Sequence, residues 1–205
     1  MANGREFPTP SKYRIQGRLP HYDDQLIIQM ITFCLADAYP SMSSKIDKSL
    51  RVTELDGHLH RGLGDCILND PLNATIVERA FLHFHKARYQ LHAWVVMPNH
   101  VHVLLTVFDD FPMWQVVRNW KSFSSKAINE IRGGSGVVWQ PDYHDRYMRN
   151  EEHFQGALDY IENNPVAAEL CNEANEWRFS SAWPDQGWRN AGGTPALPVP
   201  DPESS

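Results

Sequence analysis

Cysteine, long apolar runs and an N-terminal leader are scarce or missing in this chain, and each absence excludes a class of protein. The 205 residues include three cysteines, Cys34, Cys66 and Cys171, with no Cys-x-x-Cys pair. This odd, scattered set argues against a disulfide framework and against a zinc site built from cysteine pairs. No apolar run reaches the roughly 18 residues of a spanning helix, and the N-terminus has no signal-peptide core. We therefore expect a cytoplasmic protein that does not enter a membrane.

An overall excess of positive charge is also missing. The net charge is -6 at pH 7 and the isoelectric point is about 5.9, which does not favour a nucleic-acid-binding protein on bulk grounds. The charge is unevenly distributed, however. Residues 111–150 carry six basic against three acidic side chains, and residues 1–20 carry four against one. These two segments are where a polyanion could bind, although a solvated surface explains the same charges equally well.

The hydrophobic pattern predicts strands and helices that follow one another in a mixed order. The expected elements are a strand over 26–35, a helix over 71–89, strands over 91–97 and 100–107, a helix over 113–131, an extended segment over 137–148 and a helix over 151–163. The short connection around Pro98 and Asn99 makes the two middle strands an antiparallel hairpin. This order predicts an α+β fold with an antiparallel, ferredoxin-like sheet and helices packed on a face.

The chain length suits one domain, and no internal repeat divides it. We expect residues 1–11 to form an N-terminal tail and residues 12–185 to form the domain. Residues 186–205 are rich in proline and glycine and cannot build a core, so a disordered tail is expected there.

The sequence His-x-His occurs three times, at 58–60, 83–85 and 100–102. The second pair falls in the expected helix 71–89, where residues i and i+2 point roughly 200° apart and cannot bind one ion together. The first pair lies in a glycine-rich loop and is expected at the surface. Only His100 and His102 sit in a strand, which turns both imidazoles to one face. They form either half of a metal site or a pair of hydrogen-bonded strand histidines.

The helix expected over 151–163 supplies candidate partners for this pair. Asn150 is a good N-cap for it. Its apolar stripe predicts that Tyr160 and Asn164 flank the buried face, where they could look into a cleft beside the sheet. An alternative for Asn164 is that it caps the helix end, because Pro165 disfavours helical geometry at the residue before it. The spacing by itself predicts no more than a metal site near a tyrosine.

Two longer motifs extend this prediction. Trp-Val-Val-Met-Pro-Asn-His-Val-His at 94–102 and Tyr-Ile-Glu-Asn-Asn-Pro-Val at 160–166 resemble the REP-associated tyrosine transposases, single-tyrosine relatives of the HUH insertion-sequence transposases. The resemblance covers about residues 12 to 185. It also includes Leu-Pro-His-Tyr at 19–22, Thr-Phe at 32–33, Trp-Lys-Ser-Phe at 120–123, Trp-Gln at 139–140, Asp-Arg-Tyr at 145–147 and Trp-Arg-Phe-Ser-Ser-Ala at 177–182.

The resemblance implies a ferredoxin-like HUH domain and a DNA-cleaving centre. It implies that His100, His102 and Asn164 bind Mg²⁺ or Mn²⁺, which suits nitrogen and oxygen ligands. It further implies that Tyr160 attacks a phosphodiester of single-stranded DNA and leaves a 5′-phosphotyrosine and a free 3′-hydroxyl. The base that takes the phenol proton is Glu162 or water.

The implied substrate is a hairpin of a repetitive palindrome. Candidate DNA-binding residues are Lys121, Arg146, Arg149, Trp120 and Tyr147. One alternative is a catalytically silent protein that only binds hairpin DNA, and another is an unrelated metal hydrolase that uses His58 and His60 together with the strand pair. A single nucleophilic tyrosine per chain, as the resemblance implies, is compatible with a monomer or a homodimer.

Overall fold

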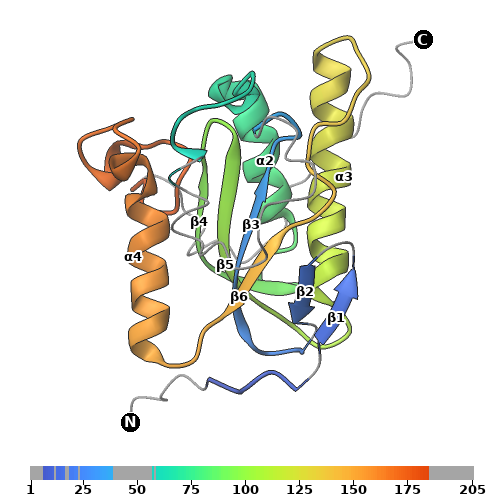
Figure 1. Ribbon diagram of the computed structural model, residues 1–205, viewed down its shortest axis with the longest axis vertical. Helices are drawn as coiled ribbons and strands as arrows, with labels where there is room; N and C mark the ends of the chain where they lie inside the picture. The colour runs from blue at the N-terminus through green and yellow to red at the C-terminus, as the bar shows by residue number, and fades with distance from the viewer. Residues whose placement is uncertain are drawn as a thin grey trace.

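A four-stranded antiparallel sheet forms the centre of the protein (Figure 1). A computed structural model describes residues 7–11, 13–16, 19–22, 24–38, 57 and 59–184. The strands lie in the order β4 (Tyr89–Val96), β5 (His100–Val107), β3 (Ile28–Cys34) and β6 (His144–Tyr147). Strands β3 and β5 are central and almost wholly buried. A sheet that is covered on both faces needs apolar residues on both, which explains the continuous apolar sequence of these strands.

Two helices cover one face of the sheet and a third covers the other (Figure 1). They are α2 (Pro71–His83) and α3 (Met113–Ile131) on the first face and α4 (Glu151–Ala167) on the second. Alternate residues of β3 show the division, because Ile31 packs in the cluster of α2 and α3, whereas Met30 packs in the cluster of α4. The expected α+β fold is confirmed, with helices on both faces rather than one. Within the described residues, no helix is long and apolar enough to cross a membrane.

Helix α2 ends earlier than the sequence predicted. It stops at His83, and Tyr89, which the prediction placed at the helix end, is already the first residue of β4. Lys86 adopts a left-handed conformation with φ of 65°, which reverses the chain between the two elements. The hydroxyl of Tyr89 then donates to the Phe81 carbonyl at 2.8 Å and fixes the reversal against the helix. His85 therefore lies outside the helix, contrary to the prediction.

Helix α4 begins where expected and ends later. The Asn150 side chain accepts a hydrogen bond from the His153 backbone N–H at 2.8 Å, so the predicted N-cap is confirmed. The helix runs through Pro165 to Ala167, beyond the expected end at residue 163. A proline in the last turn removes a single intrahelical bond, and the backbone N–H groups of Ala168 and Leu170 still bond to carbonyls of that turn. Asn164 is therefore helical rather than a C-cap.

The C-terminal part of the described chain closes the β4 edge of the sheet. Backbone bonds join Val96 N to Phe179 O and Ser181 N to Trp94 O, both at 2.8 Å. The Arg178 guanidinium contacts the buried Glu78 of α2 at 2.9 Å, which ties this segment to a helix. The described residues also include two single-turn 3-10 helices. The first, η1 (Ile67–Asn69), precedes α2, and the second, η2 (Ala174–Glu176), precedes the segment that closes the β4 edge.

The β6 edge carries a small hairpin that the sequence did not predict. Strands β1 (Tyr13–Gln16) and β2 (Leu19–Tyr22) pair antiparallel and lie beside β6 (Figure 1). Within the expected N-terminal tail, Phe7 packs its ring on Phe154 of α4, with ring centroids 6.4 Å apart. The expected C-terminal tail, residues 186–205, lies outside the described residues.

A buried histidine joins the hairpin to the sheet. His21 of β2 is 1% exposed, and its two ring nitrogens contact Asp142 at 2.9 Å and Asp145 at 3.1 Å. Its ring stacks on Tyr143, with centroids 4.0 Å apart. Burial alone would lower the pKa of His21, but hydrogen bonds and charges from the two aspartates raise it to about 9. The imidazolium is therefore the form present at neutral pH.

The raised pKa of His21 predicts that the protein loses stability as pH rises. Its pKa of about 9 when folded exceeds the ordinary 6.5, so its contribution is full below pH 6.5 and falls as pH approaches 9. Between pH 6.5 and 8 we expect the free energy of unfolding to fall by about 1.5 kcal/mol as the contribution of His21 is lost. Lys121, whose pKa is lowered by burial to about 8, is half-deprotonated at the upper end of this window, so the comparison with a His21 variant is needed to isolate the histidine.

Urea unfolding of the wild type and of His21→Gln across this range measures the effect. The variant should lose that part of the pH dependence. Equal slopes in the two proteins would show that the imidazolium does not stabilise the fold.

Candidate active site

The strand histidines and the helical tyrosine meet on the α4 face of the sheet. In β5, His102 lies directly opposite Thr32 of β3, and its ring centroid is 4.8 Å from that of His100. The Tyr160 ring of α4 lies against His102 at 5.4 Å, nearly edge to face. The alternation of the strand thus brings both imidazoles to one side, as expected, and α4 presents the phenol to that side.

One helical turn beyond Tyr160, Asn164 reaches the same place. Its side chain is 1% exposed, and its Oδ1 lies 3.3 Å from Nε2 of His60. The Tyr160 hydroxyl is buried and has no hydrogen-bond partner among the described residues. Burying a hydroxyl without a hydrogen-bond partner costs free energy. Such a group therefore indicates a functional role rather than a contribution to stability.

Burial keeps both strand histidines neutral. The pKa of His100 is lowered well below 6.5, first by burial and then by the neighbouring His102 and His60, while Asn164 partly opposes the shift. The pKa of His102 is lowered to about 3, again first by burial and then by His60. Metal ions bind the neutral form of imidazole, so no proton has to be removed at pH 7 before either ring can act as a ligand.

Hydrogen bonds also set which ring nitrogen can act as a ligand. The Asn99 side chain donates to the carbonyls of Leu59 and Leu63 at 3.1 and 3.2 Å, so its Oδ1 is the atom that contacts Nδ1 of His100, at 2.8 Å. A carbonyl oxygen only accepts, so Nδ1 of His100 carries the proton and Nε2 carries the lone pair. This Nε2 is buried and has no hydrogen-bond partner among the described residues.

The ring of His102 is held in a similar way, by the Thr32 hydroxyl at 2.7 Å from Nδ1. Ligating histidines usually have their second nitrogen bonded by such a partner. These residues fit a divalent ion. In the described part of the chain no three His, Cys, Asp or Glu side chains form a metal cluster. Among the described residues, the Asn164 amide oxygen is the candidate for a third protein ligand.

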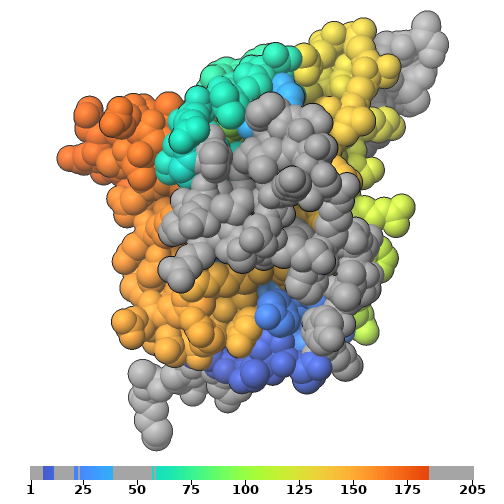
Figure 2. Space-filling view, in the orientation of Figure 1, coloured from blue at the N-terminus to red at the C-terminus, as the bar shows by residue number. Residues whose placement is uncertain are grey.

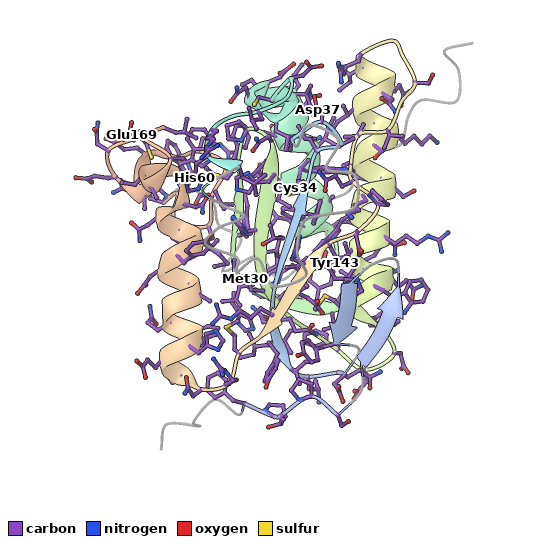
Figure 3. The ribbon with its side chains drawn as sticks, viewed as in Figure 1. Met30, Cys34, Asp37, His60, Tyr143 and Glu169 are labelled. Atoms are coloured by element: carbon purple, nitrogen blue, oxygen red, sulfur yellow. The ribbon has the colours of Figure 1, made fainter. Side chains whose placement is uncertain are left out.

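A residue expected at the surface, His60, lies at this site instead. His60 is half-buried, contacts Asn164, and has its ring centroid 6.2 Å from that of His100. Figure 3 shows it beside the C-terminal half of α4. No local pattern marks this position, because the contact joins residues 104 apart in the chain. Its expected companion His58 lies outside the described residues.

Two expected DNA-binding residues lie on the other side of the sheet. Trp120 of α3 is 3% exposed and donates from Nε1 to the Tyr89 hydroxyl at 2.9 Å, so it packs in the core and has no face for a base. The Lys121 ammonium donates to the carbonyls of Gln140 and Asp142 at 3.0 and 2.7 Å. The burial of Trp120 argues against the expected stacking on DNA, and Lys121 ties α3 to the segment that precedes β6.

The remaining expected residues lie where β6 leads into α4. Arg146 and Arg149 are exposed. Burial, and after it the charges of these two arginines, lower the pKa of His153 at the start of α4. Arg146 is opposite Met30 of β3, so its side chain starts from the α4 face of the sheet. Tyr147 is half-buried, with its ring edge-on to Tyr22 at 5.0 Å. Figure 2 shows the region from β6 to α4, in orange, as one continuous surface.

The carboxylate considered as a base for Tyr160 points elsewhere. Glu162 accepts a hydrogen bond from the Ser181 hydroxyl at 3.0 Å, in the segment that closes the β4 edge. Two residues along a helix differ in direction by roughly 200°, so Glu162 and Tyr160 leave α4 on different sides.

A cavity of about 260 Å³ lies between α2 and α3, lined by aromatic side chains and Arg88. Its wall includes Trp120, so it lies on the sheet face opposite Tyr160 and is separate from this site.

Comparisons with known proteins place this chain near a family of transposases. Residues 67–164 match the family described as IS200-like transposases. The chain is 30% identical over 96 residues to the REP-associated tyrosine transposase of Escherichia coli (strain K12), which covers 45% of this chain and 54% of that protein. It thus spans about half the length of that relative. The fold resembles the structure of a REP-associated tyrosine transposase bound to a REP hairpin, with TM-score 0.57, 18% identity, and coverage of 89% of this chain and 96% of the other.

The Asn99 contacts generate a prediction. Asn99→Ala removes the acceptor for Nδ1 of His100 and leaves the carbonyls of Leu59 and Leu63 without their donor. We expect a loss of about 1–3 kcal/mol in the free energy of unfolding and a change in the His100 tautomer, visible by nitrogen-15 NMR. The matched control is Asn129→Ala, whose amide also bonds a backbone carbonyl, that of Gly136, but away from the site. Unchanged His100 signals in Asn99→Ala would contradict the assignment.

Proposed function

We propose that this chain, whose residues 67–164 match the IS200-like transposases, cuts and rejoins single-stranded DNA at palindromic hairpins. One observation carries the proposal. The Tyr160 hydroxyl, buried and without a partner among the described residues, lies beside two neutral histidines and one turn before a buried asparagine. A nucleophile beside groups that can hold a metal ion is an arrangement suited to metal-assisted phosphodiester cleavage through a covalent intermediate.

The proposed metal ligands are His100, His102 and the amide oxygen of Asn164, and the proposed ion is Mg²⁺ or Mn²⁺. When bound there, the ion supplies positive charge beside a phosphate oxygen. The protein contributes two imidazoles that are already neutral and already oriented by Asn99 and Thr32. Such preorganisation reduces the free-energy cost of assembling the site when DNA arrives.

In the proposed reaction the Tyr160 oxygen attacks phosphorus and forms the new P–O bond. The bond from phosphorus to the 3′ oxygen breaks, and that oxygen takes up a proton and becomes a 3′-hydroxyl. The phenol proton passes to water, because Glu162 is bonded to Ser181 and faces away. The 5′-phosphotyrosine preserves the energy of the phosphodiester, so a 3′-hydroxyl of another strand can reverse the step and join the DNA.

The proposed DNA surface includes Arg146 and Arg149, which are exposed at the start of α4 on the side of the sheet that carries Tyr160. Tyr147 and Lys121 remain candidates for further contacts. The structural neighbour is bound to a REP hairpin, and we extend this class of partner to the present chain. DNA in the cytoplasm would be its substrate, and both a monomer and a homodimer are compatible with one nucleophilic tyrosine per chain.

The decisive prediction concerns covalent attachment. Incubation of the protein with Mn²⁺ and a hairpin-bearing single strand should give an adduct that survives SDS, and Tyr160→Phe should give none. The matched control Tyr143→Phe changes a tyrosine that stacks on His21 and should form the adduct normally. Hairpin binding with no adduct under several metals would favour the catalytically silent alternative. Repeated hydrolysis that persists in Tyr160→Phe would favour the metal hydrolase.

A second prediction concerns the arginines. Arg146→Ala and Arg149→Ala should each weaken hairpin binding several-fold, whatever the hairpin sequence. Each should lower by about one the slope of log affinity against log salt, because each removes a phosphate contact. Arg118→Ala is the control, an exposed arginine on α3 on the opposite face. If all three variants bind alike, the surface at the start of α4 is not the DNA site.

A further inference from the structure

His60 contacts the proposed ligand set without belonging to it. Its Nε2 lies 3.3 Å from Oδ1 of Asn164, and its ring is 6.2 Å between centroids from His100. It comes from the loop before η1, whereas the proposed ligands come from β5 and α4. Nothing in the family motifs quoted above includes this position.

The loop that carries His60 is fixed at several points. Leu59 is 1% exposed, and the Asn99 side chain bonds the carbonyls of Leu59 and Leu63, on either side of His60. Gly64 adopts φ of 86°, and a Cβ there would lie 2.7 Å from the Asp37 backbone oxygen. A side chain at this position would clash with backbone, so the close approach requires glycine. The position of His60 is therefore built into the fold.

The contact between His60 and Asn164 has a defined direction. Oδ1 of an amide only accepts hydrogen bonds, so Nε2 of His60 must be the donor. While His60 keeps this tautomer, turning the Asn164 amide over would bring its NH₂ group against this N–H, and two donors would oppose each other. The amide oxygen has two lone pairs, so it can accept from His60 and still bind a cation.

We propose that His60 is a positioning residue that holds the Asn164 amide with its oxygen, rather than its nitrogen, available to the divalent ion. The inference rests on the proposed function, since it assigns Asn164 as a ligand. In this proposal His60 is not itself a ligand, because its Nε2 is directed at the Asn164 amide oxygen. Partners of this kind typically change metal affinity by about 10- to 100-fold.

The test is Mn²⁺ binding by the full-length protein without DNA, followed by the electron paramagnetic resonance signal of the free ion. The proteins are the wild type, His60→Ala, His60→Gln, Asn164→Ala and the double variant of His60→Ala with Asn164→Ala. His83→Ala, on α2 on the far side of the sheet, controls for loss of a histidine as such. Thermal unfolding and hairpin binding are measured for each.

We expect His60→Ala to weaken Mn²⁺ binding about tenfold, with unchanged hairpin binding. His60→Gln, whose amide can donate to Oδ1, should restore the affinity to near that of the wild type. The double variant should bind no more weakly than Asn164→Ala alone, because His60 acts through Asn164.

Three results would overturn the inference about His60 alone. They are wild-type affinity in His60→Ala while Asn164→Ala is weakened, failure of His60→Gln to restore binding, and an additional loss in the double variant, which would mean a direct role for His60. Wild-type affinity in Asn164→Ala, or no Mn²⁺ binding by the wild type, would instead reject the proposed ligand set and the inference with it.

Discussion

The structure depends on the alternation of side chains along β5, the central strand that is covered on both faces. Val101 and Val103 turn toward α2 and α3 and are fully buried in that core, while His100 and His102 turn toward α4 and are equally buried. Two imidazoles at the centre of a sheet lose their contact with water, which costs free energy unless hydrogen bonds replace it. The strand can contain them because Asn99 and Thr32 bond to one nitrogen of each ring.

The same burial determines the chemistry of the site. It lowers the pKa of both imidazoles far enough to keep them uncharged at neutral pH. It also removes water from the Tyr160 hydroxyl. His21 shows the opposite outcome in the same fold, because two aspartates at hydrogen-bond distance outweigh burial and raise its pKa to about 9. Neighbouring charge rather than depth thus decides whether a buried histidine becomes a structural cation or remains a neutral potential ligand.

The sequence predicted the parts of this arrangement that local periodicity determines. The strands around Pro98 and Asn99, the shared face of His100 and His102, and the approach of Tyr160 all follow from the periods of strands and helices. Where tertiary contacts decide, the prediction failed. The predicted end of α4 was too early. Pro165 disfavours helical geometry at Asn164, but both residues are buried in the last turn of the helix, and this packing outweighs the local effect. Trp120 belongs to a motif of the family resemblance, which suggested DNA contact, yet it is buried in the core between the sheet and the helices.

His60 shows the same limit more sharply. Its loop has no periodicity from which a direction can be read, and its position depends on Asn99, 39 residues later in the chain, as well as on the close approach of Gly64 to Asp37. Asn99 therefore has two structural roles. It sets the tautomer of His100, and it anchors the loop that brings His60 to Asn164. The proposed ligands on β5 and α4 are thus connected through a side chain and a loop that contribute no ligand themselves. The geometry of such a centre depends on residues that a search for ligand spacing passes over.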